Sequence, residues 1–391
     1  MADVGAAHSA AAVPKPAPDC ELKDDLNDPR YRQLPLRECE VAGLTSKFHE
    51  CDQAAVTNRN WHRGIAMVAI VGGILAVVFA IAWLAAEVHQ GRFVFTQETL
   101  LRGEACFVVL AGLAILLGYV LAFKTRWLAQ RHRASLCAHL KFEFLMQPDR
   151  WQSSGAAEQY LRTELTNRLA PEYKRLVNDA VNGPLPHGGM HAAENLMLTR
   201  ESRRQLIEYY LERRLRPQRQ YLGGSIAHAK TTDRILGFLM HLLFVLSLVA
   251  VGLHLLAHHF SVPAAGPPWL ADLFSVVAGR LPWLKDSCNL RTLATFAVFA
   301  AASLPVLSLL FRAWRSAFEY SRNRRRFHAA DLALADKEDT LLHGLLAQHV
   351  GSEPGELPAA PVLRELWWCE HVLTAEHLEW LSLMHKAEWY V

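Results

Sequence analysis

The sequence predicts an all-α integral membrane protein with four transmembrane helices, arranged as two tandem two-span units with long cytoplasmic helices. Three observations support this prediction. Of the 391 residues, 51% are hydrophobic and only 20% are charged. The apolar residues gather in four runs long enough to cross a bilayer, and no alternating pattern typical of β-strands is present. A simple soluble enzyme is therefore excluded.

The first part of the chain contains a tail and the first two spans. The tail, residues 1–30, is rich in Ala and Pro and lacks the apolar segment of a signal peptide, so we expect it to be disordered. The first span is predicted at residues 64–86 and the second at residues 105–123. At about 1.5 Å per residue, such runs cross or nearly cross a hydrocarbon core of about 30 Å. Residues 31–150 thus form the first two-span unit.

The middle of the chain, residues 151–215, is predicted to form a cytoplasmic hairpin of two helices. Apolar residues recur at helical spacing in both halves, and the Gly- and Pro-rich run 182–189 marks a turn between them. The first helix carries Leu161 and Leu165, and the second carries Leu206 and Tyr210. Pro217 predicts a break before the next helix, because proline has no backbone N–H to donate.

The last part of the chain repeats the two-span pattern. Residues 216–350 contain spans predicted at residues 235–257 and 293–311, followed by a long helix that leaves the membrane. Pro305 lies inside the fourth span, where we expect a kink because one helical hydrogen bond is lost. Residues 362–391 are predicted to form a C-terminal amphipathic helix that carries several tryptophans.

The basic residues predict the orientation, although the formal net charge is only +3. Lys and Arg gather before the first and third spans and after the second and fourth. Because positive charge favours the cytoplasmic side, we expect a multi-pass protein of the cell inner membrane with both termini in the cytoplasm. A basic run beyond the fourth span is predicted to attract anionic lipid headgroups. It comprises Arg322, Arg324, Arg325 and Arg326.

Small residues predict where the spans pack against each other. The first span carries them at every fourth position, and the second span repeats the pattern. Such rows allow helix backbones to approach closely in lipid, where no hydrophobic gradient drives association. Packing within one chain is favoured, while packing between subunits of a homo-oligomer stays open. The residues are Gly72, Ala76, Ala80, Ala114 and Gly118.

No motif predicts catalysis or a bound cofactor. The sequence has no GxSxG or HExxH pattern, and its seven cysteines include no CxxC pair. Glu370-His371 and Glu376-His377 are six residues apart, which places equivalent atoms on different faces of a helix and argues against a metal site. We therefore predict that the protein is not an enzyme, holds no metal or cofactor, and does not bind nucleic acid.

The second half resembles a known family. The run from Tyr209 to Gln218, followed by Tyr221, Lys230 and a span pair, is similar to the bacterial SMODS- and SLOG-associating two-transmembrane effector domains, or SLATT-like domains. The closing helix of that family carries spaced Glu and Trp residues, and this chain has Glu370, Glu376 and Trp380 at similar positions. The first half looks like a diverged copy of the same unit, on the basis of Tyr31, Asp52, Ala54, Ala55 and Arg63.

The resemblance implies a membrane-perturbing or pore-forming effector in a conflict or antiphage system, controlled by a nucleotide-sensing partner. We therefore predict an oligomeric inner-membrane effector that permeabilises the membrane on a cytoplasmic signal, with membrane lipids as partners. The alternative is a non-catalytic membrane scaffold whose cytoplasmic helices dock a soluble partner. In either case Glu370, Glu376 and Trp380 on the C-terminal helix are the predicted docking residues.

Overall fold

The computed structural model describes residues 28–88, 96–151, 153–183, 196–261, 287–317, 320–341, 345 and 355–386. It is about 91% helical, which confirms the all-α prediction. Residues 1–27 of the predicted tail and residues 184–195, which include most of the predicted turn, lie outside the described residues.

The helices group into two compact units, which alternate along the chain. One unit, here called the polar unit, comprises Met1–Asn60, Phe123–Lys230 and Ser321–Glu388. The other, here called the apolar unit, comprises Trp61–Ala122, Thr231–Tyr320 and Trp389–Val391. This division separates polar from apolar helices and does not follow the two sequence halves, so the tandem two-span arrangement stays a prediction.

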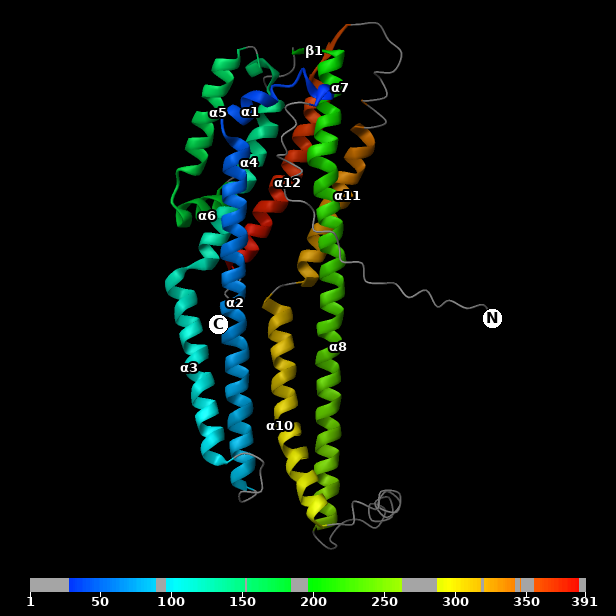
Figure 1. Ribbon diagram of the computed structural model, residues 1–391. Coiled ribbons are helices and arrows are strands. Elements are labelled where there is room, and N and C mark those ends of the chain that lie inside the picture. The colour runs from blue at the N-terminus through cyan, green and yellow to red at the C-terminus, as the bar shows by residue number, and fades with distance from the viewer. Residues whose placement is uncertain are drawn as a thin grey trace, which may run out of the picture. The chain divides into compact units, whose positions relative to one another are not determined.

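The apolar unit is built from four long helices (Figure 1). They are α2 (Leu44–Val88), α3 (Gln97–Leu121), α8 (Arg216–Ser261) and α10 (Ser287–Ala317). The described residues contain four helices long and apolar enough to cross a membrane, as predicted from the sequence. Helices α2 and α8 each continue without a break into the segments that belong to the polar unit.

The polar unit contains the remaining helices of the described chain. The α-helices are α1 (Leu36–Val41), α4 (Phe123–Leu145), α5 (Ser154–Leu169), α6 (Tyr173–Asn182), α7 (Arg200–Tyr210), α11 (Tyr320–Asp339) and α12 (Ala360–Lys386). Short 3-10 turns lie at Pro29–Tyr31 and Pro148–Trp151, and a π-helical turn, η4, covers Leu211–Leu215. Helix α12 therefore occupies most of the range predicted for the C-terminal amphipathic helix.

The expectation that the chain forms no strand is wrong. Strand β1 (Met197–Thr199) pairs antiparallel with β2 (Glu356–Pro358), and Leu198 lies opposite Leu357. Each strand has only three residues, which is too short for an alternating pattern to stand out in the sequence. The small sheet joins the segments that lead into α7 and α12.

The predicted helical hairpin at residues 151–215 is also not what the structure forms. Leu161 and Leu165 of α5 lie in a core with Phe144 of α4, whereas Leu206 and Tyr210 of α7 lie in a second core that includes α12. Helix α4 separates the two groups because it carries large apolar residues on two faces. The two segments therefore pack on different surfaces.

The break expected at Pro217 is absent, and a π-helical turn stands before it. Helix α7 passes through Leu211–Leu215 directly into α8, whose second residue is Pro217. Proline cannot donate a helical hydrogen bond and its ring clashes with the carbonyl four residues earlier. The wider π-turn relieves this conflict and keeps the helix continuous, and such turns are frequent at functional positions.

Candidate functional site

Two antiparallel helices of the polar unit, α4 and α12, share a row of polar and aromatic contacts, here called the α4–α12 seam. His139 of α4 contacts Glu370 of α12, and His132 contacts His377. A lower residue number on α4 is thus paired with a higher one on α12, as expected for antiparallel helices. The partners on each helix are seven residues apart, which is two helical turns and therefore one face. Further along, the rings of Trp127 and Trp380 meet edge to face at 5.8 Å, and Lys124 Nζ donates to His385 O at 3.4 Å.

Glu370 is the centre of this seam and is completely buried, with 0% of its surface exposed. Arg214, in the π-helical turn η4, donates from Nε to Oε1 at 2.7 Å and from Nη2 to Oε2 at 3.0 Å. The Tyr210 hydroxyl donates to Oε1 at 3.0 Å, and His139 Nδ1 lies 2.9 Å from Oε2. Both carboxylate oxygens are therefore fully engaged, which is what a buried charge requires.

The surroundings of Glu370 keep its carboxylate ionised. Burial alone raises the pKa of a carboxyl group, but the charge of Arg214 and the hydrogen bonds from His139 and Arg214 outweigh that effect. Together they lower the pKa of Glu370 to about 2. The Arg214–Glu370 pair is therefore a permanent buried ion pair near neutral pH.

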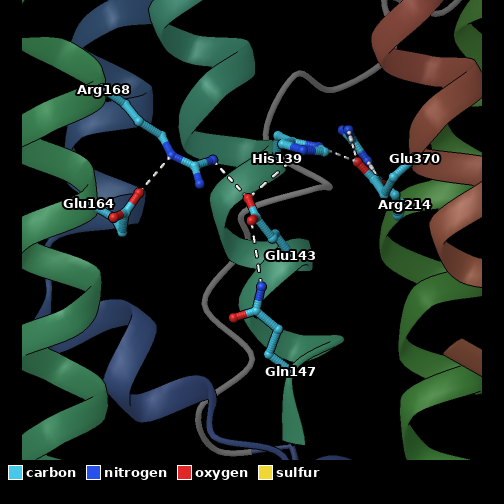
Figure 2. A network of polar contacts seen from close by, with 7 residues as sticks. All are labelled: His139, Glu143, Gln147, Glu164, Arg168, Arg214 and Glu370. Atoms are coloured by element: carbon cyan, nitrogen blue, oxygen red, sulfur yellow. Dashed lines mark hydrogen bonds and ion pairs between the residues drawn. The ribbon is translucent and has the colours of Figure 1, made fainter. Parts of the chain in front are cut away.

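A chain of contacts extends from Glu370 through α4 to α5 (Figure 2). His139 Nε2 lies 3.9 Å from Glu143 Oε2, one turn further along α4. Arg168 of α5 contacts that same oxygen at 2.8 Å and also pairs with Glu164 at 3.2 Å. The network thus ties α12, α4 and α5 together with charged groups.

The second polar rung of the seam is a pair of neutral histidines. The rings of His132 and His377 are stacked with an interplanar angle of 8°, and Nδ1 of His132 lies 3.1 Å from Nε2 of His377. Burial lowers the pKa of His132 to about 4, and burial followed by neighbouring positive groups lowers the pKa of His377 well below its usual value. The ring of Trp380 also stacks with that of His377, with centroids 5.8 Å apart.

A second buried ion pair joins α12 to α11. Arg326 is 8% exposed, and its Nε lies 3.3 Å from Glu376 Oε1. In the described part of the chain, the three guanidinium nitrogens of Arg326 have no hydrogen-bond partner, and neither does Oε1 of Glu376. The two groups are therefore close but not aligned for a hydrogen bond. This pair is close but poorly satisfied, in contrast to Arg214–Glu370.

The structure corrects the prediction that Glu370, Glu376 and Trp380 form a docking surface. Glu370 is fully buried, and Glu376 faces Arg326 inside the polar unit. Trp380 packs against Trp127 and His377. These residues are engaged within the chain because α12 has partners on several sides, which a helical wheel drawn from one sequence does not reveal.

The basic run beyond the fourth span is only partly available to lipid headgroups. Arg322 and Arg325 are exposed and Arg324 is half-buried. Arg326 is buried beside Glu376, so the prediction that it contacts headgroups is wrong. Consecutive residues of a helix point to different faces, and Arg326 lies on the face of α11 that packs against α12.

The small residues of the first two spans occupy different environments in the apolar unit. Gly72 and Ala76 of α2 are buried and Ala80 is half-buried, while in α3 Ala114 is buried and Gly118 is half-buried. A Cβ at Gly72 would lie 3.3 Å from the Ala111 Cβ, so α2 and α3 approach closely there. Nearby, the rings of Phe79 and Phe107 are 5.4 Å apart.

Helices α8 and α10 of the apolar unit pair through serine hydroxyls. Ser247 Oγ donates to Ala301 O at 3.2 Å, and Ser308 Oγ donates to Met240 O at 3.3 Å. At one end Arg315 makes two contacts with Asp233, the shorter at 2.6 Å. Pro305 lies inside α10, between these contacts. Such interhelical hydrogen bonds are typical of helix pairs in membranes.

Sequence reasoning did not single out Arg214, His139 or His132 as site residues. Arg214 belongs to the run on which the family resemblance rests, and the seven-residue spacing of His132 and His139 matches that of Glu370 and His377. These matched spacings were the available signal. In the described residues no group of three or more His, Cys, Asp or Glu side chains lies close enough to hold a metal ion.

The geometry at the α4–α12 seam is therefore that of a buried charge network, in which Glu370 joins α12 to η4 and α4. No family model, curated protein or solved structure matches this chain. The resemblance to SLATT-like domains thus stays a prediction that rests on the residues quoted for it.

Proposed function

We propose that this chain is an oligomeric inner-membrane effector whose polar unit lies in the cytoplasm and controls the permeability of its apolar unit. The proposal is supported above all by the continuity of two helices. Helix α2 has 45 residues and α8 has 46, and each belongs partly to the polar unit and partly to the apolar unit. A change in the packing of the polar unit would therefore be carried along a continuous helix, without a flexible linker.

The surfaces of the apolar unit are consistent with this role. Many of its large apolar side chains are exposed, to an extent that soluble monomers rarely show and that lipid would cover. In α3 these include Val109, Leu113, Leu116 and Val120. The basic flanks of the spans favour a cytoplasmic location for the polar unit and for both termini. A nucleotide-sensing or other soluble protein is the proposed source of the signal.

The proposal is tested in bacterial cells that express the chain at graded levels. Membrane potential and entry of a membrane-impermeant dye are recorded at each level, together with the amount of inserted protein. An effector that oligomerises should depolarise cells above a threshold of inserted protein, whereas a scaffold should leave the potential intact at all levels. Intact potential at high levels of inserted, correctly oriented protein would contradict the proposal.

A matched pair of variants makes this test specific. Gly72→Leu places a side chain where an added Cβ already lies 3.3 Å from the Ala111 Cβ, whereas an added Cβ at Gly73 meets nothing within 4 Å. Depolarisation should be changed by the first variant and kept by the second, provided that the packing of α2 on α3 shapes the permeable state. Equal behaviour of both variants would show that this packing plays no part.

A further inference from the structure

Helix α12 contacts the extensions of three candidate spans within the polar unit. It lies along α4, which follows the second span, and beside η4, which leads into α8 and the third span. It also faces α11, which comes after α10 and the fourth span in the chain. A single helix therefore holds three segments that connect to the apolar unit.

Two ion pairs of α12, those of Glu370 and Glu376, differ in quality, and a further pair joins Glu365 to Lys337 of α11 at 2.8 Å. Glu370 accepts from Tyr210 and twice from Arg214, and its second oxygen also contacts His139. Glu376 lies near Arg326, but Oε1 and the three guanidinium nitrogens have no hydrogen-bond partner among the described residues. Buried charges without hydrogen bonds cost free energy that their mutual attraction repays only partly. The first pair therefore holds α12 firmly, and the second holds it weakly.

We propose that α12 is a two-part clamp. The half around Glu370 stays locked on η4 and, through the Lys337–Glu365 ion pair, on α11, while the half from Glu376 onward can separate from Arg326. The neutral contacts of the second half agree with this division. His132 stacks on His377, Trp127 meets Trp380, and Lys124 Nζ donates to the backbone oxygen of His385, so this half is held by aromatic packing, one histidine contact and one hydrogen bond to the backbone. Such contacts can be broken without exposing a satisfied buried ion pair.

Release of the second half would free Arg326 and the end of α4, while α8 stays anchored through Arg214 and α11 through Lys337. Helix α11 would stay joined to α8, because Arg216 pairs with Glu338 at 2.9 Å and Arg219 pairs with Asp331 at 3.2 Å. Any effect of this release on membrane permeability rests on the proposed function, whereas the release itself depends only on the packing of α12. The two can therefore be tested separately on one set of variants.

The test uses the full-length protein in lipid nanodiscs and hydrogen–deuterium exchange read by mass spectrometry. Arg326→Met leaves Glu376 buried without a partner, so peptides from residues 376–386 should exchange about tenfold faster, while peptides from residues 360–370 should be unchanged. The double variant Arg326→Met/Glu376→Leu replaces the pair with apolar groups and should restore slow exchange. Arg325→Met, which alters an exposed neighbour, is the matched control and should have no effect.

The outcomes separate the clamp from the proposed function. Faster exchange in residues 376–386 that the double variant reverses supports the clamp. Unchanged exchange in Arg326→Met, or equal acceleration in both halves of α12, overturns it. Dye entry is measured in cells on the same variants. An opened clamp without any change in permeability supports the clamp and counts against the proposed function.

Discussion

At the scale of single residues, the molecule depends on buried charges that satisfy one another. Arg214 and Glu370 are 5% and 0% exposed, and each would be costly to bury alone. Arginine suits this position because its planar group donates to both oxygens of one carboxylate, which a lysine cannot do. The arrangement explains why an acidic residue can lie in the middle of the core that α7 and α12 share.

Replacing Glu370 tests this description. Glu370→Gln leaves Arg214 buried without a counter-charge, and breaking a buried pair in this way costs about 3–5 kcal/mol. The midpoint of thermal unfolding of the polar unit should fall strongly, as followed by circular dichroism and protease resistance in detergent. Glu379→Gln, at an exposed position of the same helix, should change the midpoint little. Similar midpoints for the two variants would contradict the role given to Glu370.

At the scale of helices, the α4–α12 seam joins charged and neutral rungs that respond to pH. The folded polar unit keeps His132 and His377 neutral, because burial lowers the pKa of each. In the unfolded chain both would titrate near pH 6.5. Burial raises the pKa of Glu376. A raised carboxyl pKa favours the folded state as the pH falls, so Glu376 opposes the effect of the two histidines on stability.

The stability of the polar unit should therefore fall as the pH falls from about 6.5 to about 4. Over this range His132 and His377 bind protons in the unfolded chain but stay neutral in the folded chain. Below about pH 4.5 the lowered pKa of Glu370 adds a further loss with the same sign. Thermal midpoints across this pH range measure the slope, and His132→Phe should make it shallower. A midpoint that is flat or rises on acidification would show that these histidines are not buried as described.

The packing of α2 on α3 gives a prediction for the apolar unit. Gly72→Leu should destabilise the protein by about 1–3 kcal/mol through overpacking, because the space beside Gly72 is already filled. Gly73→Leu should be tolerated, since nothing lies near an added Cβ there. Thermal aggregation of both proteins in the same detergent checks the difference. A larger loss at Gly73 would contradict the described orientation of α2.

Much of the element pattern could be predicted, because long uncharged runs and helical periodicity are local signals. The apolar helices and α12 follow from such runs, whereas β1 and β2 are too short to leave a pattern. The π-helical turn before Pro217 could not be predicted, because its cause is a conflict within a continuous helix. The burial of Glu370 and Arg326 depends on which helices lie beside α12, and the sequence of one helix does not contain that information.

At the scale of the whole molecule, the chain alternates between its polar and apolar units. Three separate segments build the polar unit, and the spans connect them. Helices α2 and α8 pass from one unit to the other without interruption. This connectivity favours a role in which packing of the polar helices and the state of the spans depend on each other. We propose that this dependence controls permeability.

Reconstitution of the purified full-length chain into liposomes loaded with a small fluorescent dye tests that claim most directly. Dye release is measured against the protein-to-lipid ratio for the wild type and for Arg326→Met, with insertion checked by flotation and protease protection. Dye release should rise more steeply than in proportion to protein, and Arg326→Met should release dye at a lower protein-to-lipid ratio. Release no greater than from protein-free liposomes, for both proteins when fully inserted, would contradict that claim.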